Sequence, residues 1–262
     1  MRNLISGVVT VFALLIAGET SRGGSVVAPL GKLNLEGNTH NYYPYDIGGS
    51  PGGAGDSQRY QQAYEASDFA SVPGPVLITQ IAFRPDAFLG RAFSVLLPDI
   101  QINLSTITLG ADGLSLVFAN NLGPTDTIVF ARGPLSLSSN FSGPVGGPMD
   151  FDVVITLTTP FFYDPAAGNL LMDVRNFGGG TTTVLDAESI GPPTADSIGR
   201  VHTTADSPGG VNSPNAGHGD SAGLVTQFTY SQVPEPGSAC LFLVGAGLCY
   251  ISRQRRLRPP KL

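Results

Sequence analysis

Short runs of alternating apolar and polar residues fill the central part of the chain. In the clearest run, residues 151–159, Phe151, Val153, Ile155 and Leu157 fall on one side and mostly polar residues fall on the other. This period of two is typical of a β-strand with one buried face. Other runs of strand length lie at residues 76–84, 100–108, 114–119, 127–131, 170–175, 198–203 and 224–230. No segment of the body sustains a helical period over three turns, so the pattern predicts an all-β fold.

Two segments carry more specific expectations. In the run that begins at residue 76, alternation places Leu77, Thr79, Ile81 and Phe83 on one face. Residues 58–69 fit either a short helix or a strand followed by a corner. Both segments would belong to the body of the protein.

The segments between the runs favour antiparallel connections. The chain has 34 glycines and 21 prolines, and turn clusters such as Asp112-Gly113 and residues 164–169 separate apolar runs. A spacing of roughly ten residues between strands is typical of a β-sandwich or jelly-roll-like body rather than a βαβ fold. The strand order is left open by the pattern.

The first 28 residues have the features of a secretory signal peptide. Arg2 provides a positive start, residues 4–17 form an apolar stretch, and Gly18 is a small residue suited to cleavage. No clean Ala-x-Ala site occurs, so cleavage anywhere between Gly18 and Ala28 fits the pattern. The alternative is an uncleaved N-terminal anchor. We expect this segment to direct export.

The last thirty or so residues combine a proline motif, an apolar run and a basic end. Pro234 and Pro236 lack a backbone donor and disfavour helix before them, so a helix can begin only after Pro236. Residues 237–252 carry no charge, and as a helix they would span about 24 Å, somewhat short of the ~30 Å hydrocarbon core. Arginines that follow can snorkel to the interface and should stay cytoplasmic. The pattern predicts one transmembrane helix with the body outside, and the alternative is a buried C-terminal helix.

This tail resembles the PEP-CTERM sorting signal of exported bacterial proteins. The residues that carry the resemblance are Pro234, Glu235, Pro236, Ser238, Arg253, Arg255 and Arg256. Gln254 interrupts the arginines and residues 257–262 continue past them, which are mild departures from the family pattern. The resemblance implies that residues 233–262 are recognised and processed by an exosortase-type membrane protease, in a bacterium that makes exopolysaccharide. It implies nothing about the activity of the body.

Cysteine usage and charge restrict the properties of the body, residues 29–232. Both cysteines, Cys240 and Cys249, lie in the apolar run of the tail, so the body has no disulfide. Between positions 30 and 236 the chain has nineteen acidic and seven basic residues, a net charge of about −12. A body this acidic is not expected to bind nucleic acid or anionic lipid.

Motifs for catalysis and metal binding are weak. Residues 219–223, Gly-Asp-Ser-Ala-Gly, match the G-x-S-x-G pattern of serine hydrolases. The candidate bases are His40, His202 and His218, and none lies in a sequence setting typical of a catalytic triad. No zinc, phosphate-loop or EF-hand motif occurs. We therefore predict no catalytic residue, metal ligand or cofactor.

A carbohydrate-binding surface is the most specific hypothesis for the body. Five of the eight tyrosines, Tyr42, Tyr43, Tyr45, Tyr60 and Tyr64, lie in one stretch, and aromatic faces beside polar groups suit sugar stacking. Tryptophan, the usual platform, is absent, and tyrosines half-buried along an edge strand explain the cluster equally well. The sequence favours an exported, non-catalytic surface or matrix-associated protein. The alternatives are a carbohydrate-binding module and a glycoside hydrolase, which would need two carboxylates across a cleft.

Overall fold

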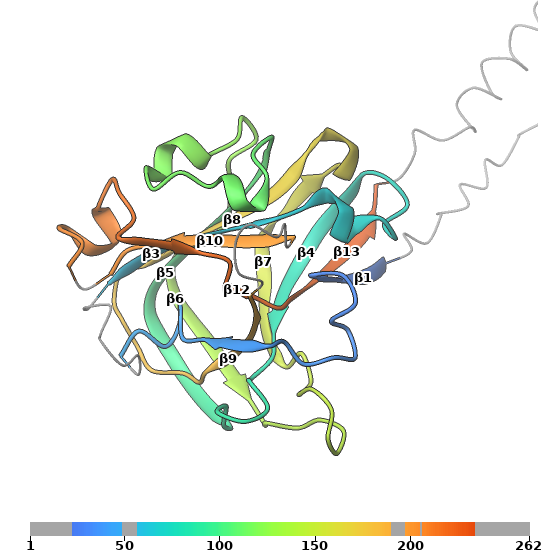
Figure 1. Cartoon of the computed structure of the whole chain (residues 1–262), viewed down its shortest axis with the longest axis vertical. Coiled ribbons are helices and arrows are strands. Elements are labelled where there is room, and N and C mark those ends of the chain that lie inside the picture. The colour runs from blue at the N-terminus through green and yellow to red at the C-terminus, as the bar shows by residue number, and fades with distance from the viewer. Residues whose placement is uncertain (1–22, 49–56, 190–196, 205, 234–262) are drawn as a thin grey trace, which may run out of the picture. The chain divides into compact units, whose positions relative to one another are not determined.

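The computed structural model describes residues 23–48, 57–189, 197–204 and 206–233 (Figure 1). Most of the predicted signal peptide and nearly all of the predicted sorting signal lie outside the described residues. Among the residues described, no helix has the length and hydropathy needed to cross a membrane.

The described body is all-β with antiparallel sheets, as predicted from the period of two. The four-stranded sheet contains, in order across the sheet, β1 (Gly23–Ala28), β13 (Thr226–Gln232), β4 (Val76–Phe83) and β7 (Val153–Tyr163). The six-stranded sheet contains β11 (His218–Asp220), β10 (Ile198–His202), β3 (Gln58–Tyr64), β8 (Asn169–Asn176), β5 (Phe93–Ile107) and β6 (Thr127–Ser139). The three-stranded sheet contains β12 (Gly223–Leu224), β9 (Leu185–Glu188) and β2 (Thr39–Asn41).

Helical structure in the described residues is limited to short 3-10 segments. These are η1 (Ala66–Phe69), η2 (Ala111–Gly113), η3 (Phe118–Asn121), η4 (Pro165–Ala167) and η5 (Gly210–Asn212). Each has only three or four residues, a length typical of 3-10 turns that connect strands.

The two larger sheets share one hydrophobic core, which makes the body β-sandwich-like. Ile81 and Phe228 from the four-stranded sheet and Ile102 and Met172 from the six-stranded sheet are fully buried in the same cluster. Removing such a side chain from water contributes ~1.5–3 kcal/mol. This core forms without any disulfide, because no cysteine lies in the described residues.

The sheets approach each other at the edges formed by β6 and β7. The hydroxyl of Thr158 on β7 donates a hydrogen bond to the carbonyl oxygen of Val129 on β6, at 3.0 Å. Both edge strands have a neighbour on their other side, β5 for β6 and β4 for β7. The contact therefore closes the core along this side.

Strand β1 extends the body toward the N-terminus. Gly23–Ala28 pairs along its whole length with β13, and Val26 and Ala28 are buried in the core. These six residues lie before the predicted start of the body at residue 29. The structure thus places within the sheet a segment that the sequence pattern assigned to the leader.

Most of the predicted strands are present, and their alternation is clearest in β7. Val153, Ile155 and Leu157 are buried, whereas Val154 is 41% exposed. In 58–69 the strand-and-corner alternative is correct, because β3 is followed by η1. Between Val153 and Leu157 the alternation of buried and exposed residues in β7 has no interruption.

Two predictions about strands are wrong for identifiable reasons. In β4 the buried residues before the middle of the strand are Val76 and Ile78, not Leu77 and Thr79. The pairing register of β4 with β7 shifts between Ile78 and Gln80, and such an irregularity exchanges the two faces.

The second error concerns residues 114–119, which form only an isolated antiparallel bridge, between Val117 and Asn215, and no strand. The side chain of Asn121 accepts a hydrogen bond from the Ser115 backbone nitrogen at 2.7 Å and donates one to the Ser115 carbonyl oxygen at 2.8 Å. The side chain therefore satisfies the backbone groups of Ser115, so that pairing does not extend beyond the bridge.

Candidate functional site

The polar ends of strands β10 and β11 form the candidate site at one edge of the six-stranded sheet. The two strands are antiparallel, with Arg200 opposite Asp220 and His202 opposite His218. Side chains alternate along a strand and directly opposed residues share a face, so these four side chains project from the same face. Pairing of β10 with β3 places Tyr60 beside His202 on this face.

Arg200 and Asp220 form a forked ion pair. The Arg200 Nε lies 2.6 Å from Oδ1 of Asp220, and Nη2 lies 3.0 Å from Oδ2. Oδ1 also accepts a hydrogen bond from the Ala222 backbone nitrogen at 2.9 Å. Burial of the Asp220 carboxyl is outweighed by the hydrogen bonds and charge of Arg200, which lower its pKa to about 2. The carboxylate is therefore ionised at neutral pH.

His202 is held in one orientation and one tautomer. Its Nδ1 lies 2.9 Å from the carbonyl oxygen of Thr203, which can only accept, so Nδ1 carries the proton. Its ring lies 4.5 Å from the Tyr43 ring and 5.5 Å from the His218 ring, centroid to centroid. Burial, reinforced by the positive charge of Arg200, lowers the pKa of His202 to about 4. The imidazole is therefore neutral at neutral pH.

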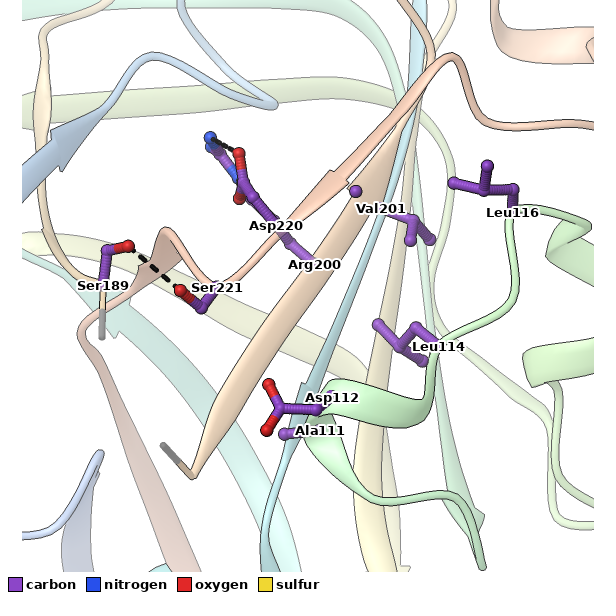
Figure 2. A pocket seen from close by; sticks show the side chains of 10 residues that line it. Ala111, Asp112, Leu114, Leu116, Ser189, Arg200, Val201, Asp220 and Ser221 are labelled. Carbon is purple, nitrogen blue, oxygen red and sulfur yellow. Dashed lines mark hydrogen bonds and ion pairs between the residues drawn. The ribbon is translucent and has the colours of Figure 1, made fainter. Parts of the chain in front are cut away.

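A cavity of about 620 Å³ lies beside the ion pair. Figure 2 shows that Val201, Leu114 and Leu116 lie on one side of β10, whereas the side chains of Arg200 and Asp220 lie on the other. The lining residues are Ala111, Asp112, Leu114, Leu116, Ser189, Arg200, Val201, Gly219, Asp220 and Ser221. Such a mixture of apolar and polar walls suits a small polar molecule with an apolar face.

The G-x-S-x-G segment, residues 219–223, contributes to this cavity. The hydroxyl oxygens of Ser221 and Ser189 lie 3.0 Å apart, and Ser221 is 7% exposed. The adjacent carboxylate of Asp220 is bound by Arg200 and by Nε2 of His218, at 2.9 Å. The segment thus presents a serine pair and an ion pair to the cavity.

The predicted candidate bases separate into two places. His202 and His218 lie opposite each other at the site. His40 is exposed on β2 and its ring contacts the edge of the Tyr42 ring, with centroids 5.7 Å apart. The sequence marks these three histidines as candidate bases, but no motif joins any two of them. One sequence signal could have placed His202 and His218 together. Polar residues alternate in Arg200-Val201-His202 and in His218-Gly219-Asp220, as on one face of two strands.

The predicted glycan-binding tyrosines are also divided. Tyr45, Tyr60 and Tyr64 are fully buried in the core, so their rings offer no surface on which a sugar could stack. Tyr42 and Tyr43 are half-buried, and the ring of Tyr43 rests against His202. The five tyrosines therefore form no common platform.

A second cluster of carboxyl groups surrounds Arg84. Its guanidinium binds Asp186, with Nε at 2.7 Å and Nη2 at 2.6 Å from Oδ2, and both side chains are fully buried. Glu36 accepts from the backbone nitrogen of Ala87, and Asp86 accepts from the backbone nitrogens of Phe88 and Leu89.

These contacts give the Arg84 cluster a structural role. Asp186 accepts from the backbone nitrogen of Gly37 at 2.9 Å, and Arg84 donates to the carbonyl oxygens of Leu33 and Leu35. One ligand atom from each of the three acids lies within 4.8 Å of the others, a spacing that could also hold a cation. Through these bonds to the backbone the cluster fastens residues 33–37 to the sheet, and Oε2 of Glu36 is left buried without a partner.

Comparisons with protein-family models and with curated proteins find no match to this chain. The predicted sorting residues, Pro234 to Arg256, lie outside the described residues. The candidate site is therefore supported by its geometry alone. The sorting signal is supported by the sequence alone.

Proposed function

We propose that this chain is an exported cell-surface or matrix-associated protein whose body has a non-catalytic, structural role. The observation that carries the proposal is the order of three features at the C-terminus: Pro234-Glu235-Pro236, the uncharged run 237–252 and the arginines that follow. An apolar N-terminal stretch after Arg2 supports export. Together they are typical of a protein that crosses one membrane and is sorted at its surface.

The body suits this location. It is a β-sandwich, jelly-roll-like in its short antiparallel strands, that would precede a single transmembrane helix. Its core excludes water without disulfides, and its acidic surface disfavours nucleic acid and anionic lipid. An exosortase-type membrane protease is the proposed partner, and the membrane contact lasts until processing.

Replacing Pro234-Glu235-Pro236 by three alanines tests the sorting proposal in a host that has an exosortase. We expect the variant to keep its unprocessed C-terminus and to remain in the membrane fraction. Replacing Pro192 and Pro193 by alanine is the matched control, because it removes prolines outside the motif. Intact-mass measurement of the surface protein reads the result. A mature C-terminus identical to that of the parent chain would refute recognition of the motif.

A second candidate function, carbohydrate binding, is favoured by the cavity rather than by the tyrosines. Asp112, Arg200 and Asp220 offer hydrogen-bonding groups to hydroxyls, whereas Leu114 and Leu116 offer apolar contact. Sugar rings present both kinds of surface, so the lining is complementary to them. Extracellular polysaccharide is the corresponding partner for a protein at this location.

Binding of the purified full-length chain to a glycan array and to the host exopolysaccharide tests this second function. Asp112→Asn should weaken binding at least tenfold, because Asp112 is exposed at the cavity wall. Asp206→Asn is the control, because Asp206 is an exposed acid outside the lining. If both variants bound glycan equally well, or if neither the parent chain nor the variants bound any glycan, the cavity would not be a glycan-binding site.

A further inference from the structure

The nitrogen Nε2 of His202 is a buried acceptor with no hydrogen-bond partner. His202 is only 3% exposed, and its Nδ1 proton is committed to the Thr203 carbonyl oxygen. The free lone pair is therefore on Nε2. Buried polar atoms in folded proteins nearly always have a hydrogen-bond partner. An unpartnered atom such as this one is therefore a candidate for binding a ligand. A backbone carbonyl on one ring nitrogen is also how metal-binding histidines are commonly oriented.

Two more ligand groups lie beside this imidazole. One ligand atom from each of His202, His218 and Asp220 lies within 4.8 Å of the others. Nε2 of His218 is 2.9 Å from Oδ2 of Asp220. Ligands at ~2.0–2.2 Å from one tetrahedral ion lie roughly 3.4 Å apart. The 2.9 Å pair would therefore open slightly around an ion, and any wider pair would close.

From this geometry we infer that His202, His218 and Asp220 bind one divalent transition-metal ion of the zinc class. Two imidazoles and one carboxylate are a ligand set that zinc accepts, with a fourth position left for water or another ligand. The side chain of His218 is 53% exposed, which leaves a route for the ion from solvent. The inference does not depend on export or on sugar binding.

Arg200 decides which kind of ion the site takes. Its guanidinium neutralises the charge of Asp220 through the forked pair, so the cluster has no net negative charge to attract calcium or magnesium. Those hard ions need several anionic or carbonyl oxygens. Neutral imidazoles instead suit zinc, copper and nickel. Ring contact with Tyr43 and the bond to Thr203 hold His202 ready for such an ion.

The test uses the full-length chain in detergent, without a histidine tag, after removal of metal by a chelator. Zinc chloride is titrated by calorimetry, and bound zinc is counted by elemental analysis after dialysis. We expect one zinc per chain and a rise in thermal midpoint. Cobalt(II) should give the visible absorption of a four-coordinate site.

The chain provides matched histidine variants. His218→Ala should weaken zinc binding at least tenfold, because it removes an exposed ligand with little effect on the core. His40→Ala should bind zinc as the parent chain does, because His40 is exposed on a different strand. Zinc binding that is equal in both variants, or lost equally in both, would overturn the site.

Two further measurements remain decisive whatever the variants do. In the parent chain, the imidazole ¹⁵N spectrum should show zinc shifting the Nε2 signal of His202 and leaving its Nδ1 proton in place. Calcium chloride should leave the spectrum and the thermal midpoint unchanged. A zinc-bound chain in which the His202 signals do not move, or calcium binding as tight as zinc binding, would contradict the ligand assignment.

Discussion

Two arginine–aspartate pairs lie in very different surroundings in this body. Arg84 and Asp186 are both fully enclosed, whereas the side chains of Arg200 and Asp220 are 10% and 30% exposed. Nε, Nη1 and Nη2 of Arg84 all have acceptors, and its guanidinium also lies over the Phe151 ring. Every nitrogen of the Arg84 guanidinium therefore has a hydrogen-bond acceptor within the fold.

The second pair leaves bonding capacity unused. Nη1 of Arg200 and Nε2 of the neighbouring His202 are buried without partners. Leaving a buried polar group unpaired costs ~1–3 kcal/mol, and a ligand that bonds to the group would remove that cost. An ion pair alone therefore does not mark a functional site. In the Arg84 cluster the unbonded atom is Oε2 of Glu36, outside the pair, whereas in the Arg200 cluster it is a nitrogen of the pair itself together with an imidazole nitrogen beside it.

Arg84→Met should give the largest effect on stability. The variant leaves Asp186 buried without its counter-ion, and breaking a buried pair in this way typically costs about 3–5 kcal/mol. Urea unfolding at pH 8 measures the change. Arg132→Met serves as control, because Arg132 and Asp99 form an exposed pair whose loss should matter far less. Equal destabilisation by the two variants would show that the Arg84 cluster is not the clamp described above.

The two pairs should also respond oppositely to pH. Burial, opposed by Arg84 and reinforced by Glu36, raises the pKa of Asp186 to about 7, from ~3.9 in an unfolded chain. The folded chain then holds this proton more tightly than the unfolded chain does. The contribution of Asp186 to the free energy of unfolding is therefore full below about pH 4 and is lost as pH rises through 7. At ~1.4 kcal/mol per pKa unit, the loss amounts to a few kcal/mol.

Unfolding curves between pH 4 and pH 8 test this dependence. Asp186→Asn should flatten it, because the residue no longer titrates. Asp220 gives the opposite sign, since its pKa is lowered to about 2 and its contribution disappears only as pH falls toward that value. An Asp186→Asn chain with the same pH slope as the parent would assign the slope to other groups.

Gly37→Ala should destabilise the enclosed cluster at its backbone. A Cβ at this position would lie 1.9 Å from the carbonyl oxygen of Ala187, and such overpacking costs ~1–3 kcal/mol. At the open cluster, the nearest atom to a Cβ on Gly219 would be a side-chain carbon of Val201 at 3.0 Å, and the next are a Leu116 carbon and the Arg200 carbonyl oxygen at 3.4 and 3.5 Å. Gly219→Ala should therefore change the unfolding midpoint less, and a reversed order would mean that the backbone at residue 37 can move aside.

The sequence predicts features that depend on neighbouring residues better than features that depend on contacts between distant residues. Alternation within one run correctly predicts the buried side of β7, because the pleat relates near neighbours. It fails at Thr79, where a register irregularity reverses the faces, and at residues 114–119, where Asn121 binds the backbone of Ser115 and pairing is limited to one bridge. Both failures depend on contacts that the local pattern does not contain.

The candidate site depends even more on contacts between residues that are distant in sequence. His202 and His218 meet only because β10 and β11 pair in one register, and a shift of one residue would turn one histidine to the other face. The tyrosine cluster shows the same limit in reverse. Tyr45 lies two residues after Tyr43, and Tyr64 lies in the same tyrosine-rich stretch, yet the fold buries both completely.

Those two core tyrosines give the smallest and sharpest test of the rule that unpaired polar atoms are costly. The hydroxyl of Tyr64 lies 2.8 Å from the hydroxyl of Thr226, whereas the hydroxyl of Tyr45 is buried without a partner. Tyr64→Phe should cost ~1 kcal/mol, because it breaks a buried hydrogen bond and leaves Thr226 with one partner fewer. Tyr45→Phe removes an unpaired hydroxyl and should leave stability unchanged or raise it. Urea midpoints of the two variants decide the matter, and a larger loss for Tyr45→Phe would show that its hydroxyl is bonded in solution, which would weaken the same argument for Nε2 of His202.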